Sequence, residues 1–322
     1  MYGLARIFGV IASLSFLAAG MAAAAEPPAR AVRLVVGYTP GGSPDILARV
    51  LAAKMTENLG RQVIVENRAG AGGMVAVGSV VSSPTDGSVL FLGDSSMYAV
   101  NPNMLVAGAH NPMKDFVPVA LAATSPIFLV TNAPQVNNLK DFIALAKSKH
   151  GLPYGSGGTG TTNQLAMELL KSMAGIDLSH VPYKGAAQLV PAVVVGEIVA
   201  GFGGMAITFA FANAGKVKVL GITTGKRSAL APDVPTIAES GLPGYEMSIS
   251  LGFLAPPNTP NQTVRYINAA IIDAIQAPGI REKLAATGVE AATSSPAQFA
   301  ELIEREVVQY GRLVKFARLK AE

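Results

Sequence analysis

The sequence has no cysteine, no tryptophan and few charged residues. Among its 322 residues, aromatic residues make up 6% and charged residues 14%. Without cysteine there is no disulfide scaffold, iron–sulfur cluster, thiolate zinc site or cysteine nucleophile. The scarcity of aromatic side chains argues against stacking platforms for nucleobases. The net charge of +4 is small and dispersed, so we expect no nucleic-acid partner.

The usual catalytic and metal-binding motifs are missing as well. His110, His150 and His180 lie far apart in the sequence, so each is expected at the surface or in a loop. There is no HExxH motif, no Gly-x-Ser-x-Gly elbow and no Walker A motif. One dinucleotide-type pattern, GSGGTG at 155–160, follows only a short predicted strand and is discounted. We therefore expect no enzyme, no metal and no cofactor.

The first 25 residues are typical of a secretory signal peptide. A short segment with one arginine precedes the apolar stretch Ile7–Met21, and the alanines of 22–25 provide an A-x-A cleavage site. The alternative, an uncleaved anchor, needs an apolar segment of about 20 residues. We expect cleavage after Ala25 and a mature protein in the periplasm.

Strand and helix patterns alternate through the rest of the chain, half of which is hydrophobic. The β-branched run Val32–Gly37 predicts a buried strand, and a helix capped by Ser43 follows a glycine-rich turn. The pattern restarts at Ile127–Thr131. The alternation predicts an α/β fold of two doubly wound lobes with parallel sheets. We expect residues 26–125 and 250–322 to form one lobe and residues 126–249 the other.

Two glycine-rich turns, Tyr38–Ser43 and Gly155–Thr162, each connect a predicted strand to a helix. Such turns direct backbone N–H groups at the positive end of a helix dipole toward a ligand. Hydroxyl donors stand in or near them, namely Ser95, Ser96, Thr159, Thr161 and Thr162. Ordinary helix capping is the alternative for either turn, but two such turns in separate lobes favour an anion clamp.

Other polar residues near these turns allow two interpretations. Asp45 either offsets the dipole of its helix, or accepts a hydrogen bond from a ligand or from its own loop. Lys184 either offers a cation to the anion or is solvated.

Several longer motifs extend over essentially the whole mature chain. They are PGGSPD (40–45), VENRAGAGG (65–73), PTDG (84–87), KDFVPV (114–119), GTGT (158–161), HVPYKG (180–185), PDVPTIAE (232–239) and GLPGY (241–245). In this order they resemble the Bug family of extracytoplasmic solute receptors, the substrate-binding components of tripartite tricarboxylate transporters.

The resemblance implies a type II periplasmic-binding-protein fold, in which two lobes close on a small carboxylated solute across a central cleft. It implies ligand contacts in the first lobe from Tyr38, Thr39, Gly41, Gly42, Asp45, Ser95 and Ser96. In the second lobe it implies Ser156, Thr159, Gly160, Thr161 and Asn163, and we add Lys184 and Gly204 to this set.

The sequence departs from the family pattern at two places. Gln164 stands where relatives often have histidine, and Ala200 and Gly204 stand where relatives often have acidic residues. A less acidic cleft disfavours an amino acid, whose ammonium group needs a carboxylate partner. We expect a monomeric receptor that delivers a mono- or dicarboxylate, or an aromatic acid, to a membrane transporter. A receptor for a membrane sensor kinase and a secreted hydrolase are the alternatives.

Overall fold

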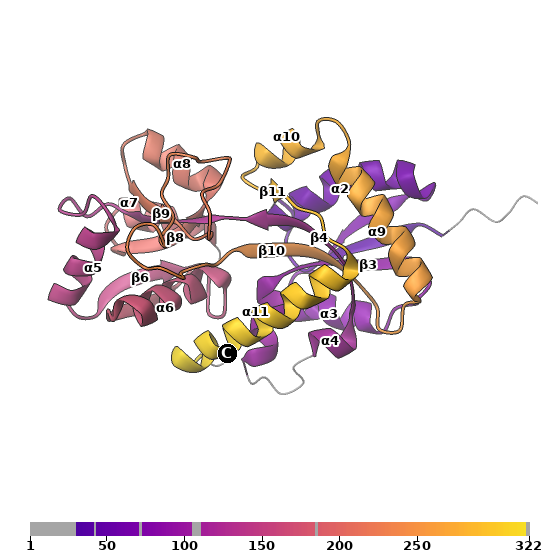
Figure 1. Cartoon of the computed structure of the whole chain (residues 1–322), viewed down its shortest axis with the longest axis horizontal. Helices are drawn as coiled ribbons and strands as arrows, with labels where there is room; N and C mark the ends of the chain where they lie inside the picture. Colours follow the sequence, from indigo (N-terminus) through magenta and orange to yellow (C-terminus); the bar gives the residue numbers. More distant parts are fainter. Residues whose placement is uncertain (1–29, 42, 71–72, 105–110, 184–185, 320–322) are drawn as a thin grey trace, which may run out of the picture. The chain divides into compact units, whose positions relative to one another are not determined.

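Two separate β-sheets form the framework of the protein in a computed structural model (Figure 1). The structure describes residues 30–41, 43–70, 73–104, 111–183 and 186–319. The expected signal peptide, Gly42 and Lys184 lie outside the described residues.

The first sheet has six strands in the order β11-β4-β10-β3-β1-β2. They are β1 (Val32–Val36), β2 (Val63–Asn67), β3 (Val89–Asp94), β4 (Val117–Ser125), β10 (Ile249–Ala255) and β11 (Glu290–Ala291). β1 pairs in parallel with β2 and β3, whereas β10 pairs antiparallel with β3 and β4. β11 adds a short antiparallel edge beside β4.

The second sheet has five strands in the order β7-β6-β8-β5-β9. They are β5 (Ile127–Thr131), β6 (Leu152–Ser156), β7 (Leu178–Pro182), β8 (Ala200–Gly204) and β9 (Lys218–Ile222). β6 is parallel to β7 and β8, and β5 is antiparallel to β8 and β9.

The prediction of purely parallel sheets was wrong, because both sheets are mixed. The antiparallel strands β5 and β10 are those that follow when the chain passes from one sheet to the other. Only Pro126 separates β4 of the first sheet from β5 of the second. Parallel neighbours within one sheet need a crossover connection, usually a helix, and no such connection lies between β4 and β5.

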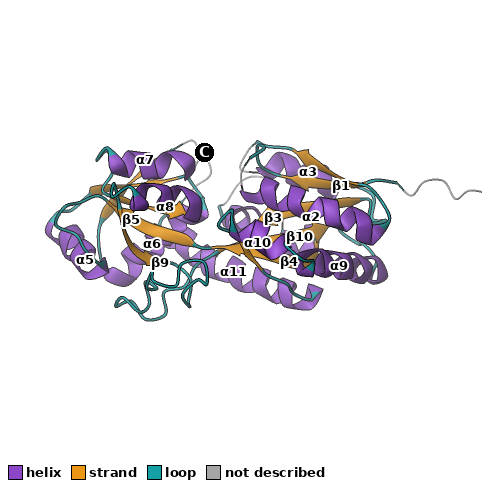
Figure 2. Cartoon of the chain, turned by 90° about the horizontal axis from the view of Figure 1, so that it is seen from above, coloured by secondary structure: helices purple, strands orange, loops and turns teal. Residues whose placement is uncertain are grey.

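Helices flank the strands of both sheets (Figure 2). The α-helices are α2 (Ser43–Leu59), α3 (Met74–Val81), α4 (Pro112–Asp115), α5 (Leu139–Ser148), α6 (Thr162–Ala174), α7 (Leu189–Val194), α8 (Met205–Asn213), α9 (Asn261–Gln276), α10 (Ile280–Ala285) and α11 (Pro296–Phe316). Three short turns of other helix types are η2 (Ser96–Val100), η3 (Asn101–Asn103) and η4 (Ala186–Gln188). No helix among the described residues has the length and apolar character needed to cross a membrane.

Apolar residues at helical spacing fix α2 on the first sheet. Leu47, Leu51 and Met55 recur every four residues and are fully buried in one core cluster with strand residues such as Leu34 and Phe253. Fully burying one such side chain contributes about 1.5–3 kcal/mol. The core therefore holds the glycine-rich loop between β1 and α2 at the end of a rigid strand–helix unit.

The strands of each sheet come from distinct parts of the sequence. The first sheet uses strands within 32–125 and 249–291, and the second uses strands within 127–222. We refer to the parts built on the first and second sheets as lobe 1 and lobe 2. The expected division of the whole chain at residues 125 and 250 stays a prediction, and residues 31–322 form one compact unit.

A buried polar network joins the start of β10 to η2 and α11. The Ser250 backbone N–H donates to Ser95 Oγ at 2.9 Å, and Ser250 Oγ donates to Glu306 Oε1 at 2.6 Å. The Tyr98 hydroxyl donates to the Ser250 carbonyl at 3.1 Å. Burial raises the pKa of Glu306 to about 7, although hydroxyl groups of Ser250, Ser95 and Tyr98 partly oppose the shift. Lobe 1 thus contains a carboxyl group that the fold favours in its protonated form.

The Glu306 carboxyl group should make the stability of the protein depend on pH, and Glu306→Gln should remove this dependence. Because the folded-state pKa of about 7 exceeds the ordinary glutamate value of 4.5, the folded state holds the extra proton between these values. The free energy of unfolding of the wild type therefore falls as the pH rises from 4.5 to about 7. The total loss is at most about 3 kcal/mol, and it persists at higher pH. We expect thermal unfolding to show Glu306→Gln more stable than wild type at pH 8, with the advantage lost at pH 5. The exposed Glu304→Gln on the same helix is the control, and equal effects of both variants would contradict the prediction.

Candidate functional site

A cavity of about 240 Å³ lies where loops of both lobes meet. Its lining comes from four loops that follow β1, β2, β3 and β6. The residues are Gly37, Tyr38, Thr39, Ala69, Gly70, Gly73, Ser96, Asn101, Thr159, Gly160 and Thr161. In open α/β sheets, ligands bind outside the carboxyl ends of parallel strands, which is where these loops lie. The volume falls just below the roughly 300–1,000 Å³ of pockets for drug-sized ligands, so the cavity suits a smaller solute.

The described cavity wall contains no charged side chain. Its polar groups are hydroxyls of Tyr38, Thr39, Ser96, Thr159 and Thr161, the side-chain amide of Asn101, and the backbone. An anion in this cavity would be held by neutral donors rather than by a lysine or arginine of the described wall.

Tyr38 is fixed by a buried aspartate behind the cavity. Its hydroxyl donates to Asp94 Oδ2 at 2.6 Å, and the Met97 N–H donates to Asp94 Oδ1 at 3.2 Å. Burial raises the pKa of Asp94, although the hydrogen bonds from Tyr38 and Met97 oppose this, and burial beside Asp94 holds the pKa of Tyr38 well above its usual value. Tyr38 therefore stays a phenol whose proton is directed at Asp94 and not into the cavity.

Asp45 closes the loop between β1 and α2. The Gly41 N–H donates to its Oδ2 at 2.9 Å, and Asn67 Nδ2 donates to its Oδ1 at 2.9 Å. Burial disfavours the charged form, but hydrogen bonds from Arg49, the Gly41 amide and Asn67 outweigh it and lower the pKa of Asp45. Of the roles considered for Asp45, the structure supports the one in which it locks its own loop. Gly41, with φ +92°, adopts the left-handed conformation that this turn requires.

The loop between β6 and α6 is held in the same way. The Gly160 N–H donates to Gln164 Oε1 at 2.7 Å, and the Gly158 N–H donates to Ser156 Oγ at 3.1 Å. Thr161 Oγ1 donates to the Gly158 carbonyl at 2.8 Å. The amides of Gly41 and Gly160, which the sequence suggested as ligand donors, therefore donate within their own loops.

Two contacts bring the loops of the two lobes together. Ser96 Oγ of η2 and Thr162 Oγ1 of α6 lie 2.9 Å apart and share a hydrogen bond. Gly160 packs so closely on Met104 that an added Cβ would lie 2.3 Å from the Met104 sulfur. The lobes thus touch at the edge of the cavity.

The structure places about half of the predicted site residues on the cavity wall. Those that line it are Tyr38, Thr39, Ser96, Thr159, Gly160 and Thr161. Gly42 and Lys184 lie outside the described residues, so the structure describes no contact for either.

The remaining predicted residues support the loops from behind or lie elsewhere. Ser95 is fully buried and accepts from Ser250, Ser156 contacts His180, and Asn163 donates to the Phe202 carbonyl at 2.6 Å. Gly204 ends β8 and caps α8.

The sequence analysis missed Gly37, Ala69, Gly70, Gly73 and Asn101 as lining residues. A signal existed for three of them, because Ala69, Gly70 and Gly73 belong to a glycine-rich segment that follows β2, a strand parallel to β1. Asn101 follows the π-helical turn η2, an irregular element that no apolar periodicity predicts.

His180 was expected at the surface or in a loop, and this was wrong. It lies half-buried on β7, because this strand places it between Ser156 of the neighbouring β6 and Gln164 of α6. Ser156 Oγ and His180 Nε2 are 2.7 Å apart, the distance of a nucleophile–base pair. Ser156 is fully buried, however, so a substrate has no direct access to its hydroxyl. Among the described residues, no group of three histidine, aspartate or glutamate side chains is placed to hold a metal ion.

Comparison with known sequences identifies relatives along nearly the whole chain. Residues 47–319 match the family model of TctC, the tripartite tricarboxylate transporter family receptor. A UPF0065 protein from the tcbD-tcbE intergenic region of Pseudomonas sp. (strain P51) is 36% identical over 299 residues, covering 91% of this chain and 88% of the relative. BugT of Bordetella pertussis is 30% identical over 318 residues, covering 98% of this chain and 97% of its own.

Solved structures share the fold. Rpa4515 of R. palustris with adipate has a TM-score of 0.80 and 32% identity, covering 91% of this chain and 99% of the other. MatC (Rpa3494) from Rhodopseudomonas palustris with bound malate has a TM-score of 0.77 and 29% identity, covering 89% of this chain and 100% of the other.

These comparisons confirm the resemblance noted in the sequence and the two-lobed periplasmic-binding-protein fold that it implied. The relatives form a family of solute-binding receptors, not of enzymes. The chain belongs to the TctC family of tripartite tricarboxylate transporter receptors, in which the Bug proteins are its relatives.

Proposed function

We propose that this protein is a periplasmic receptor that binds a small carboxylate between its lobes and delivers it to a tripartite tricarboxylate transporter. The observation that carries the proposal is the hydroxyl-rich cavity to which loops of both lobes contribute, with no charged side chain among the described residues of its wall. Two relatives of the same fold hold dicarboxylates, adipate in one and malate in the other, which supports the same ligand class here. The periplasmic location rests on the expected signal peptide and on the family.

Neutral donors suffice for such a ligand. A hydrogen bond to a charged oxygen contributes about 1.5–3 kcal/mol, and a micromolar dissociation constant corresponds to about −8 kcal/mol. Three or four such bonds from hydroxyl, amide and backbone groups of the cavity wall would reach this range. The small volume restricts the ligand to a short chain or a single ring.

The network around Ser156 weakens the alternative of a secreted hydrolase. A serine nucleophile must give its proton to histidine, whereas Ser156 Oγ lies 2.9 Å from the Gly158 carbonyl, to which only the hydroxyl can donate. Its burial excludes a substrate from the same position.

Carboxylates should stabilise the protein against heat without being consumed. At one hundred times the dissociation constant, a ligand specific for the folded state adds about 2.7 kcal/mol to the free energy of unfolding. We expect at least one of adipate, malate and benzoate to raise the melting temperature by several degrees, while adipamide, the uncharged analogue of adipate, does not. Stabilisation by adipamide equal to that by adipate, or no response to a wider set of organic acids, would contradict the proposal.

Gly160→Val should impair ligand binding more than it impairs folding. The added side chain must displace Met104 at the contact between the lobes, and valine at φ +77° is strained. Gly175, at the C-terminal end of α6, has a similar φ of +62°, and a Cβ added there would meet no atom within 4 Å, so Gly175→Val controls for backbone strain. We expect both variants to lose about 1–2 kcal/mol of stability.

Isothermal titration calorimetry with the stabilising carboxylate should separate the two variants. Gly160→Val should bind at least about tenfold more weakly than wild type, which corresponds to about 1.4 kcal/mol, whereas Gly175→Val should bind as wild type does. Equal affinity in both variants would refute the assignment of this loop to the site.

A further inference from the structure

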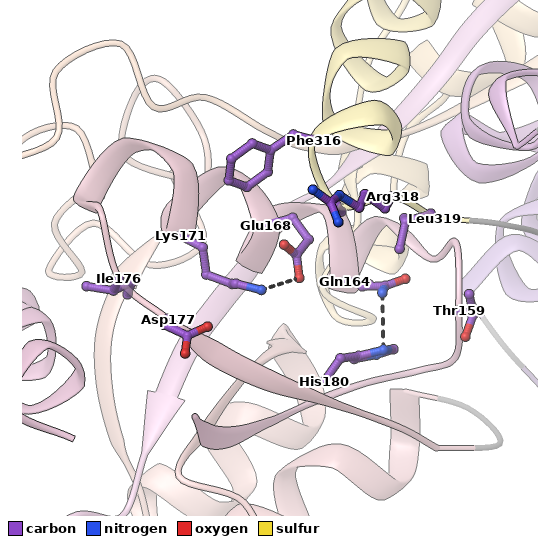
Figure 3. Close-up of a pocket in the computed structure, with 11 residues that line it drawn as sticks. Thr159, Gln164, Glu168, Lys171, Ile176, Asp177, His180, Phe316, Arg318 and Leu319 are labelled. Carbon is purple, nitrogen blue, oxygen red and sulfur yellow. Dashed lines mark hydrogen bonds and ion pairs between the residues drawn. The ribbon is translucent and has the colours of Figure 1, made fainter. Parts of the chain in front are cut away.

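A chain of hydrogen bonds runs from the ligand-facing loop of lobe 2 to His180. The Gly160 N–H donates to Gln164 Oε1 at 2.7 Å, Gln164 Nε2 lies 3.1 Å from His180 Nδ1, and His180 Nε2 lies 2.7 Å from Ser156 Oγ. Figure 3 shows the Gln164 amide facing the histidine ring, with Thr159 of the loop nearby. Thr159 and Gly160 also line the cavity between the lobes. The chain therefore links one wall of that cavity to a titratable side chain.

The Gly160 N–H fixes the orientation of the Gln164 amide and, through it, the role of His180 Nδ1. A backbone N–H can only donate, so the Gln164 atom that faces Gly160 must be the carbonyl oxygen. The amide nitrogen of Gln164 then faces His180 and can only donate, so Nδ1 must be the acceptor. His180 is consequently neutral in this arrangement and carries its proton on Nε2.

The other side of the ring agrees with this assignment. The His180 Nε2–H donates to Ser156 Oγ. Ser156 Oγ also accepts from the Gly158 N–H at 3.1 Å, and its hydroxyl proton goes to the Gly158 carbonyl at 2.9 Å. Both ring nitrogens of neutral His180 therefore support the same loop, one through Gln164 at Gly160 and the other through Ser156 at Gly158.

A second proton on His180 is incompatible with this network. Protonation at Nδ1 places an N–H against the Gln164 amide nitrogen, so two donors face each other across 3.1 Å. Rotation of the Gln164 amide would give His180 an oxygen but would turn the amide nitrogen toward the Gly160 N–H. Either way, one hydrogen bond of the loop is lost.

Solvent protons can reach His180. The side chain is half-buried and lines an open cavity of about 560 Å³, which shares Thr159 with the cavity described above (Figure 3). The charged groups of that cavity are Glu168 and Lys171 of α6, Asp177 before β7, and Arg318 after α11.

The described charged groups of the cavity beside His180 include both signs. Glu168 is engaged by Lys171 Nζ at 2.9 Å and by the Tyr154 hydroxyl at 2.5 Å. The Tyr154 ring of β6 packs beside the histidine, with ring centroids 5.1 Å apart, and Asp177 and Arg318 are of opposite charge. Histidine is the side chain whose unperturbed charge changes between about pH 5 and 8.

We propose that Gln164 is a positioning residue of the ligand loop, which it holds through Gly160 only while His180 is neutral. The proposal rests on the proposed function in one respect, since it treats this loop as part of the carboxylate site. Acidification should therefore loosen the loop and weaken carboxylate binding.

Nuclear magnetic resonance of the protein without ligand tests the network directly. All four residues of the chain lie in lobe 2, so the measurement does not depend on an added carboxylate. We expect the His180 ring to carry its proton on Nε2 at pH 8. Between pH 8 and 5, the Gly160 amide should shift with the midpoint of His180, and its protection from hydrogen exchange should fall at least about tenfold. The exposed His150 is the internal control and should titrate independently of Gly160. A Gly160 amide that stays unchanged while His180 titrates, or an Nδ1 proton at pH 8, would overturn the proposal.

Gln164→Glu separates positioning from a general structural role. A carboxylate can accept from the Gly160 N–H and from a protonated His180 together, so it should hold the loop in acid. We expect the Gly160 amide of this variant to stay protected from pH 8 to 5. Gln164→Leu, which has no acceptor, should leave it unprotected throughout. Gln276→Glu, an exposed site on α9, makes the same change of charge and should behave as wild type. Loss of protection in acid in Gln164→Glu as large as in wild type would contradict the proposal.

Ligand titration extends the test to binding. The affinity of the wild-type protein for the carboxylate that stabilises it should fall about tenfold or more between pH 8 and 5. In Gln164→Glu, the change in the logarithm of the affinity over the same range should be less than half as large. If no carboxylate binds, the proposed function fails while the amide measurements still decide the role of Gln164. If carboxylates bind to the wild type and to Gln164→Glu with the same pH dependence, the coupling of Gln164 and His180 to ligand binding is refuted, and the proposed function stands.

Discussion

The hydrogen bond between the hydroxyls of Ser96 and Thr162 brings the two lobes into contact beside the cavity, where a shared apolar core also joins them. It places the loop after β3 against the start of α6, at an oxygen–oxygen distance of 2.9 Å. The loops after β1 and β2 reach the same cavity because β1 pairs with both β2 and β3 in parallel register. The pairing of the strands therefore brings the loops after β1, β2 and β3 to the same end of the sheet.

Each lobe stabilises its glycine-rich loop by the same device. In both loops a glycine amide donates to a side-chain oxygen four residues later, on the first turn of the following helix. Lobe 1 uses Gly41 and the carboxylate of Asp45, and lobe 2 uses Gly160 and the amide of Gln164. The difference between these acceptors is chemical: the aspartate is held ionised by Arg49, whereas the amide is oriented against a histidine. The second loop is thereby linked to the imidazole ring of His180.

The sequence predicted most of the fold, because apolar periodicity and glycine turns define strand–helix units such as β1–α2. It predicted the positions of both glycine-rich loops for the same reason, and six of the proposed site residues line the cavity. It could not show where amide protons go. Whether the Gly160 N–H faces a ligand or Gln164 depends on the rotamer of a side chain, and glycine content carries no information about it. The antiparallel strands β5 and β10 were missed for a related reason, since the return of the chain between sheets leaves no local pattern.

Three buried polar side chains around the site are satisfied by partners within the protein. Asp94 accepts from Tyr38, and Ser95 accepts from Ser250. The Ser156 hydroxyl accepts from the N–H of Gly158 and donates to the carbonyl of the same residue. These residues are functional in the sense that they hold the cavity wall in place, although they do not line it. Among the described residues, the cavity wall is thus built from neutral groups that other buried side chains support.

The most direct test of the central claim is a crystal structure of the mature protein with the carboxylate that stabilises it most. The account predicts electron density for the carboxylate between the loops that carry Thr39 and Thr159, within hydrogen-bond distance of hydroxyls from both lobes. Density for the carboxylate in the open cavity beside His180, or on one lobe alone, would contradict it.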